Sequence, residues 1–213
     1  MIGIEHHAVL YALFAKEIIK YLPAKEAEDL IEKATFRYGY NRGERMRKVT
    51  LSNGYPLNMN SFFLYGEWKG RPGENLSSLQ QMAEATESHV TKCAWYDAWK
   101  KHDLTRYGCY YCRYIDQGIC AGYQGGFSLA VPSAIGLGDE KCIFHWTQSY
   151  DPVQLQKYRS VTGEANIKPF SFHCRDLYDC FAGFLDAYPD KKEQILHSVM
   201  ESFRSLFPDE SDF

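Results

Sequence analysis

Three segments between Cys93 and Trp146 hold most of the distinctive residues of the chain: CAWYDAW at 93–99, YGCYYCRYID at 107–116 and GLGDEKCIFHW at 136–146. The stretch contains five of the seven cysteines and three of the four tryptophans. Cys112 and Asp116 are four residues apart in a segment with a helical pattern. This spacing places a thiol and a carboxylate on one helix face, about one turn apart.

The composition indicates a globular protein and excludes several classes of partner. A chain of 213 residues with 45% hydrophobic residues can form a sizeable core. The net charge of −3 gives no general attraction to nucleic acid or to an acidic membrane surface. The first residues lack a signal-peptide pattern, and no apolar run is long enough to cross a membrane. Seven cysteines, an odd number, without an export signal favour reduced thiols and a cytoplasmic location.

The order of predicted elements defines a fold class. Helical spacing predicts helices at 4–22, 24–48, 95–101, 104–121, 170–188 and 191–207. Strands are predicted at 60–68, 88–94, 127–133 and 141–148, while 79–85 is ambiguous. This order favours an α+β fold, with an antiparallel sheet of about four strands and helices packed on it. We expect a domain at 1–150, with a helical extension at 151–213 packed on the same domain.

Two glycines interrupt the second predicted helix. Gly39 and Gly43 each reduce helix stability, so their presence predicts that another part of the molecule approaches closely there. The segment around them, Arg37–Arg45, also carries several arginines.

Cys112 is the candidate nucleophile. A catalytic thiol must be partly ionised, and a neighbouring carboxylate raises its pKa because like charges repel. Asp116 is therefore a poor activator and is better suited to holding a cationic group, such as an amidinium, or to positioning water. The alternative is that Cys112 is a packed core thiol, since free cysteine is among the most buried residue types.

A structural zinc site is a further alternative. Cys109 and Cys112 have the two-residue gap of a metal-binding pair, and Cys93 and Cys142 could complete four thiolates. The gap falls in a predicted helix rather than a tight turn, which disfavours this interpretation. No phosphate-binding loop, dinucleotide fingerprint or metalloprotease motif is present, so we expect neither a cofactor nor a metal.

Histidines and aromatic residues supply the remaining candidates. His145 and His89 lie on predicted strands, and by alternation His145 faces away from Phe144 and Trp146. The other histidines are interpreted as ordinary surface or helix residues: His6, His7, His102, His173 and His197. The aromatic residues near Cys112 could wall a small-molecule pocket or could be core: Trp95, Trp99, Tyr107, Tyr110, Tyr111 and Tyr114.

The order of these motifs resembles the L-2-amino-thiazoline-4-carboxylic acid hydrolase family. The matching elements, in order, are Arg37-Tyr38-Gly39, Cys93 with Trp95 and Trp99, Tyr111-Cys112 with Asp116, Gly138-Asp139, Cys142, and Phe144 with Trp146. The match covers roughly Ile4 to Gln148. The sequence departs from the family pattern after the predicted helix at 104–121, where Gln124-Gly125-Gly126 replaces an Asn-Pro pair.

The resemblance implies both a fold and a reaction. It relates the chain to four-vinyl-reductase-type and Bet3-like domains, which have helices on one face of a twisted antiparallel sheet and bind small molecules. The reaction that gives the family its name is the hydrolytic opening of a cyclic amidine.

The hypothesis is therefore a hydrolase of a small cyclic amidine or amide that carries a carboxylate. Cys112 attacks the ring carbon or holds a water against it, and Asp116 pairs with the amidinium. Arg37, or Arg45 as a second candidate, binds the carboxylate of the substrate. His145 or His89 moves protons.

Four further residues are expected to line the substrate site: Trp95, Tyr111, Cys93 and Cys142. The expected partner is a small-molecule substrate, with neither nucleic acid nor membrane. The last two predicted helices could cover the sheet, cap the site or form a homodimer. The alternative function is a non-catalytic small-molecule-binding or sensor domain of the same fold.

Overall fold

The computed structural model describes residues 1–162, 166–210 and 213. Within these ranges it contains eight α-helices and a four-stranded antiparallel sheet, and three of the helices follow the last strand. The predicted α+β class is confirmed. The chain forms two compact units, each built from segments that are distant in sequence. The sequence-based division at residue 150 stays a prediction.

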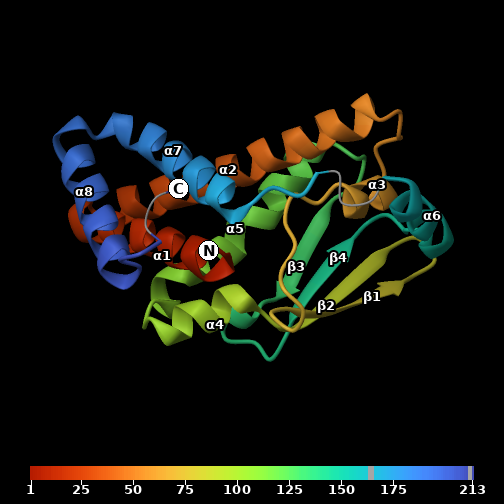
Figure 1. Cartoon of the computed structure of the whole chain (residues 1–213), viewed down its shortest axis with the longest axis horizontal. Coiled ribbons are helices and arrows are strands. Elements are labelled where there is room, and N and C mark those ends of the chain that lie inside the picture. Colours follow the sequence, from red (N-terminus) through yellow and green to blue (C-terminus); the bar gives the residue numbers. More distant parts are fainter. Residues whose placement is uncertain (163–165, 211–212) are drawn as a thin grey trace. The chain divides into compact units, whose positions relative to one another are not determined.

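Unit 1 is helical and consists of Met1–Tyr38, Ala94–Tyr114 and Pro169–Phe213. Helix α1 (Ile4–Tyr21) packs against α4 (Ala94–Lys101), α7 (Phe170–Phe184) and α8 (Pro189–Leu206) (Figure 1). The helix predicted at 4–22 is confirmed, and its run from Ala8 to Ala15 is almost fully buried on every side. A helix that packs on one layer only leaves its opposite face in water. Here α4, α7 and α8 surround α1 and cover that face as well.

Unit 2 consists of Gly39–Cys93 and Ile115–Lys168 and contains the sheet. The strands are β1 (Leu76–Gln81), β2 (Thr86–Lys92), β3 (Leu129–Ser133) and β4 (Cys142–Trp146). They lie in the order β1-β2-β4-β3, and all pairs are antiparallel (Figure 1). The 3-10 turn Ile135–Leu137 and Gly138, in the left-handed conformation at φ 104°, connect β3 to β4. The strands predicted at 127–133 and 141–148 therefore form an antiparallel hairpin.

The two faces of the sheet have different environments. Trp146 of β4 packs with Met59 and Cys120, and Phe62 and Phe63 lie against the same cluster. By strand alternation, Cys142 and Phe144 share this covered face with Trp146, whereas Ile143 and His145 lie on the other. Helices α3 (Met59–Leu64) and α5 (Thr105–Tyr123) supply Met59 and Cys120.

The predicted strand at 60–68 is wrong, because this segment begins with α3. Asn58 caps the helix: its side chain accepts a hydrogen bond from the Ser61 N–H, while the Ser61 hydroxyl accepts one from the Asn58 N–H, both at 3.1 Å. This reciprocal cap satisfies main-chain donors that the aromatic content of the segment does not reveal. The helix then turns Phe62 and Phe63 toward Trp146.

Two segments after residue 75 also differ from expectation. The ambiguous 79–85 segment is part of a hairpin, in which β1 begins at Leu76 and the turn follows Gln81. All six residues of β1 are exposed, so neither face carries an apolar pattern. Helix α6 (Pro152–Thr162) was not predicted, and it buries only Leu155. Elements that bury few side chains need few apolar residues, so the sequence shows no clear apolar periodicity there.

The second helix, α2 (Ala24–Ser52), meets α5 at the glycines. A Cβ atom on Gly39 would lie 2.4 Å from the Ile115 carbonyl oxygen, and one on Gly43 would lie 2.1 Å from that of Ile119. In return, a Cβ on Gly122 of α5 would lie 2.1 Å from the Tyr40 carbonyl oxygen. The close approach predicted from Gly39 and Gly43 is confirmed, and the approaching element is the main chain of α5.

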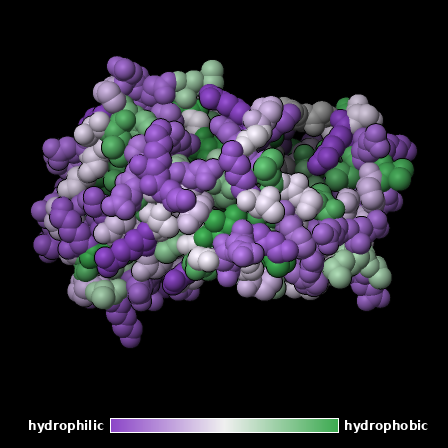
Figure 2. Space-filling view, turned by 90° about the horizontal axis from the view of Figure 1, so that it is seen from below, coloured by the Kyte–Doolittle hydropathy of each residue, from purple (hydrophilic) through white to green (hydrophobic). Residues whose placement is uncertain are grey.

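The surface is mostly hydrophilic on the face drawn in Figure 2, with apolar residues in small groups. Such scattered apolar residues are usual for a folded chain in water. No helix of the described residues is long and apolar enough to span a membrane.

The glycine contact generates a stability prediction. Gly43→Ala should lower the free energy of unfolding by about 1–3 kcal/mol, because the new methyl group meets main-chain atoms that cannot move aside. Gly183→Ala is the matched control, since a Cβ there has no neighbour within 4 Å. It should be neutral or stabilising by up to about 1 kcal/mol. Urea unfolding of both variants gives the comparison, and equal stabilities would contradict the contact.

Candidate active site

Asp116 has a carboxyl group whose pKa is raised well above its ordinary value. It lies on α5 in unit 2, half-buried, and it forms no hydrogen bond or ion pair with any described residue. Surrounding protein desolvates the carboxylate and raises its pKa to about 6, although the nearby Arg42 guanidinium acts in the opposite direction. The result is a recessed carboxylate that retains some access to solvent and titrates close to neutral pH.

A buried ion cluster from α2 lies beside it. Arg45 binds the fully buried Glu67 through two hydrogen bonds, Nε to Oε1 at 2.7 Å and Nη2 to Oε2 at 2.9 Å. Arg42 is also buried, and its Nε lies 3.6 Å from Oε2 of Glu67. The Lys168 N–H donates to the Glu67 carbonyl at 2.7 Å, which fixes the main chain at this residue. Arg42 thus interacts electrostatically with both Glu67 and Asp116.

Arg42 and Glu67 were missed as site residues. Arg42 is three residues from Gly39 and three from Arg45, so neighbouring pairs are adjacent on the helix and the pattern of glycines and arginines contained the signal. Glu67 had no comparable signal, because it follows α3 in a segment without periodic structure. The predicted carboxylate ligand Arg45 is in unit 2 and is paired with Glu67. Arg37 is exposed and belongs to unit 1.

Two cysteines of unit 2 lie near Asp116 but are poor nucleophiles. Burial, together with the charge of Asp116, raises the pKa of Cys120 to about 12 and that of Cys142 to about 11. Cys142 also accepts a hydrogen bond from the Ile135 N–H at 3.3 Å. Cys93 follows β2, half-buried, and its charge adds to the raised pKa of Cys142. Cys120 and Cys142 therefore suit the wall of a site and not covalent attack.

Cys112 belongs to unit 1, where it is half-buried. It lies four residues before Asp116 in the continuous helix α5, which confirms the helical spacing on which the pair was identified. Tyr111 and Trp95, two predicted substrate-binding residues, are brought together in the same unit. Their rings are nearly parallel, at 12°, with centroids 6.3 Å apart.

His145 lies away from this constellation. Its Nδ1 is 3.2 Å from Oε1 of Glu87, and Oε2 of the same carboxylate is 3.1 Å from Nε2 of His89. The two imidazoles hydrogen-bond to Glu87 and lower its pKa. His145 and His89 share the sheet face opposite to Cys142 and Trp146, so the structure does not bring either histidine to Asp116.

The sequence predicted that His7 is an ordinary surface or helix residue, but its side chain makes two buried hydrogen bonds. It is buried in unit 1, and its Nδ1 accepts a hydrogen bond from the Trp95 indole N–H at 3.1 Å. Its Nε2 therefore carries the proton and can donate to the Tyr38 hydroxyl at 3.0 Å. This arrangement requires a neutral imidazole, because an added proton on Nδ1 would face the indole donor. Of the other histidines interpreted as ordinary surface or helix residues, His6 and His173 are also buried.

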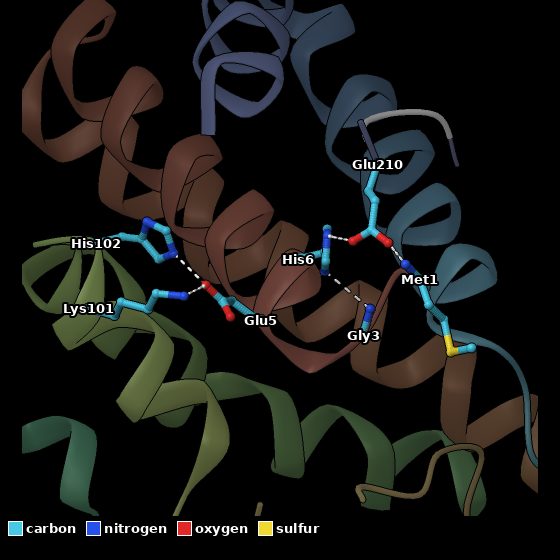
Figure 3. A network of polar contacts seen from close by, with 7 residues as sticks. All are labelled: Met1, Gly3, Glu5, His6, Lys101, His102 and Glu210. Carbon is cyan, nitrogen blue, oxygen red and sulfur yellow. Dashed lines mark hydrogen bonds and ion pairs between the residues drawn. The ribbon is translucent and has the colours of Figure 1, made fainter. Parts of the chain in front are cut away.

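A second polar network holds the start of α1 in unit 1 (Figure 3). Glu5 binds Lys101 and His102 of the α4 end, both at 2.7 Å, while His6 contacts Glu210 at 3.1 Å. Glu210 also pairs with the amino group of Met1. Burial lowers the pKa of His6, against the opposing charge of Glu5. These contacts anchor the helix and have no role in the candidate site.

Metal binding finds no support in the geometry. Among the described ranges, no group of three or more histidine, cysteine, aspartate or glutamate side chains is placed to hold an ion. The four-thiolate zinc alternative therefore lacks the clustering that it requires.

The fold and the recessed carboxylate define an α+β domain with a candidate site for a polar small molecule. The model of the L-2-amino-thiazoline-4-carboxylic acid hydrolase family matches residues 1–146, and the chain belongs to this family. Comparison with curated proteins and with solved structures gives no match to either. The resemblance noted from the motifs is thereby confirmed, and the match ends at the last residue of β4.

The raised pKa of Asp116 predicts a stability effect. Because the folded-state pKa lies above the unfolded value, the folded state binds more protons between about pH 4 and 6, and stability falls as the pH rises through this window. Asp116→Asn removes the buried charge and should raise the free energy of unfolding by on the order of 2 kcal/mol at about pH 7.5. At about pH 4.5 the gain should largely disappear, since Asp116 is then protonated.

Denaturant unfolding at the two pH values measures this difference. Asp97→Asn on α4 is the control, because the side chain is exposed and carries no comparable desolvation cost. A gain that is equal at both pH values, or a loss at neutral pH, would contradict the assignment.

Proposed function

We propose that the protein hydrolyses a small cyclic amidine that carries a carboxylate, with L-2-amino-thiazoline-4-carboxylate as the representative substrate. Family membership supports the class of reaction. The observation that carries the proposal is the recessed Asp116 carboxylate, which has no hydrogen bond or ion pair to any residue that the structure describes. A partly desolvated carboxylate without a hydrogen-bond donor is unfavourable, and a ligand that supplies donors would offset this cost.

An amidinium fits this carboxylate in charge and shape. It is planar and presents parallel N–H groups, so it can form the paired hydrogen bonds that a guanidinium forms with a carboxylate. Pairing with Asp116 keeps the amidine protonated, which makes its central carbon more electrophilic. A carboxylate that titrates near pH 6 can also accept and return a proton during the reaction.

The ion cluster of α2 complements the other end of the substrate. Arg42, Arg45 and Glu67 together carry one net positive charge, and ionised Asp116 carries one negative charge. A substrate with both an amidinium and a carboxylate has the matching pair of opposite charges. The positive cluster therefore replaces Arg37, which is exposed, in the proposed recognition of the substrate carboxylate.

Cys112 is the proposed nucleophile, on the basis of its spacing from Asp116 along α5. Its thiolate would add to the amidine carbon, a ring bond from that carbon to sulfur or nitrogen would break, and the departing atom would take up a proton. Water would then release the product and restore the thiol. In the alternative, Cys112 holds a water that attacks directly. Cys120 and Cys142 are unsuitable for either covalent role because burial keeps them protonated.

Turnover of L-2-amino-thiazoline-4-carboxylate by purified variants tests these roles. Cys112→Ala should lose at least about a thousandfold in kcat, and Asp116→Asn at least about a hundredfold in kcat/KM, with both proteins folded by circular dichroism. Cys109→Ala is the matched control, a half-buried cysteine of the same helix, and should retain activity.

Three outcomes of that experiment separate the alternatives. Normal turnover by Cys112→Ala together with an inactive Asp116→Asn would assign the attack to water. Normal turnover by both variants would refute the site. Tight binding of the substrate by calorimetry, with no turnover by the wild-type chain, would favour the non-catalytic binding domain.

The pH dependence of kcat/KM gives a separate prediction. Activity should fall on the acid side with an apparent pKa of about 6, because protonated Asp116 cannot pair with the amidinium. Arg42→Gln should move this limb to higher pH, since the Arg42 charge lowers the pKa of Asp116. A pH profile that is unchanged by Arg42→Gln would show that another group sets the acid limb.

A further inference from the structure

A chain of three buried hydrogen bonds joins four helices of unit 1. The Trp95 indole N–H on α4 donates to Nδ1 of His7 on α1 at 3.1 Å. Nε2 of His7 lies 3.0 Å from the hydroxyl of Tyr38 on α2, which donates to the His173 carbonyl of α7 at 3.4 Å. Desolvating a polar ring costs free energy, and the proposed reaction does not use this imidazole. The position of His7 at the centre of the chain therefore indicates another role.

Donor chemistry fixes the direction of every bond in this chain. An indole nitrogen can only donate, so Nδ1 of His7 is the acceptor and Nε2 carries the proton. The Tyr38 hydroxyl has one proton, which it donates to the His173 carbonyl, so its oxygen accepts from Nε2 of His7. The neutral imidazole therefore holds Trp95 through one nitrogen and Tyr38 through the other, and each attachment can be removed without the other.

The same imidazole stands edge-on to two rings that are nearly parallel to each other. Its plane makes an angle of 81° with the Trp95 ring and 78° with the Tyr111 ring, with centroids 6.0 and 5.8 Å away. The Trp95 and Tyr111 rings are parallel to within 12°. Because a hydrogen bond has a preferred direction, the bond to His7 fixes the rotation of the indole in a way that apolar packing does not.

This pair of rings lies at the edge of the core, near Cys112. Burial, together with the charges of Cys112 and Tyr111, raises the pKa of the Tyr11 hydroxyl, so the thiol and the Tyr111 ring lie in the same part of unit 1. Trp95 and Tyr111 are 6% and 8% exposed, whereas Trp99 and Tyr11, which also contact Tyr111, are 0% exposed. The parallel pair therefore keeps some access to solvent close to the proposed nucleophile.

We propose that His7 is a positioning residue, which orients Trp95 so that the parallel Trp95 and Tyr111 rings bind the flat ring of the substrate. This role rests on the proposed function and adds a residue that touches neither the substrate nor the reacting atoms. Aligned aromatic faces favour a planar cation such as a cyclic amidinium, through stacking and cation–π attraction. Loss of the His7 contact to Trp95 should therefore weaken substrate binding and leave the chemical step unchanged.

Two substitutions at His7 separate its attachments. In His7→Asn the side-chain oxygen takes the place of Nδ1 and still accepts from Trp95, whereas in His7→Gln the amide takes the place of Nε2 and the indole loses its acceptor. With L-2-amino-thiazoline-4-carboxylate, His7→Gln should raise KM about tenfold, as expected for one lost hydrogen bond, and keep kcat within about twofold. His7→Asn should stay near the wild type in both constants. Tyr38→Phe is the matched control, because it removes only the other attachment, and it should also keep its KM.

A substitution of Trp95 tests the same bond without changing His7. 3-Benzothienylalanine at position 95 has the shape of tryptophan but no N–H, so it should raise KM as much as His7→Gln does. This chain also decides the role of His7 where His7→Gln does not fold. An unchanged KM in the benzothienyl chain would overturn the proposal.

The indole signals give a readout that does not depend on turnover. Proton–nitrogen correlation NMR shows one indole signal for each of the four tryptophans, and Trp95→Phe identifies that of Trp95. The signal should stay downfield in His7→Asn and Tyr38→Phe and move upfield in His7→Gln. Equal changes of signal and KM in both His7 variants would refute the positioning role.

The outcomes also separate this role from the proposed function. Normal turnover with an unchanged KM in His7→Gln would overturn the role of His7 alone. A wild-type chain that binds the substrate by calorimetry without turnover would overturn the hydrolase, and the affinities of the His7 variants would then decide the positioning role. Absence of both binding and turnover would overturn both proposals.

Discussion

The close contact of α2 and α5 is the constraint on which the candidate site depends. Gly39 and Gly43 face α5, and Gly122 faces α2, so each helix presents a side with no Cβ atoms to the main chain of the other. Glycine within a helix reduces its stability, so three such positions represent a considerable cost. The close approach of the two helices holds the neighbouring side chains, Arg42 on α2 and Asp116 on α5, near enough to interact.

The two carboxylates near this contact, Glu67 and Asp116, differ in how closely they are paired with cations. Glu67 has a bidentate partner in Arg45 and a second cation in Arg42. Among the described residues, Asp116 has a longer-range attraction to Arg42 but no hydrogen bond through its carboxylate. A charge that is desolvated without a close partner disfavours folding, and this cost is tolerated when a bound ligand offsets it. The imbalance distinguishes Asp116 from the structural ion pairs elsewhere in the chain.

Much of the fold could be predicted from the sequence, because its long helices and the β3–β4 hairpin have strong apolar periodicity and clear end signals. The elements that lack such a pattern were not predicted correctly: β1 is exposed on both faces, α6 buries one residue, and α3 depends on a local cap at Asn58. The spacing of Cys112 and Asp116 along one helix could be predicted from the sequence. The ion pair of Arg42 with Glu67 could not be predicted from the sequence, because it joins a helix to an irregular segment. The face on which His145 lies followed from strand alternation, but the side of the sheet that the helices cover did not.

The composition of unit 1 has a consequence for how the chain is made in the cell. Helix α1 leaves the ribosome well before α7 and α8, two of the helices that enclose it, are translated. During synthesis, α1 must therefore wait with its apolar side chains in water or in contact with a temporary binding partner. We expect nascent chains that end before Pro169 to be held by chaperones that recognise exposed aliphatic segments, and to be released once α8 has cleared the exit tunnel.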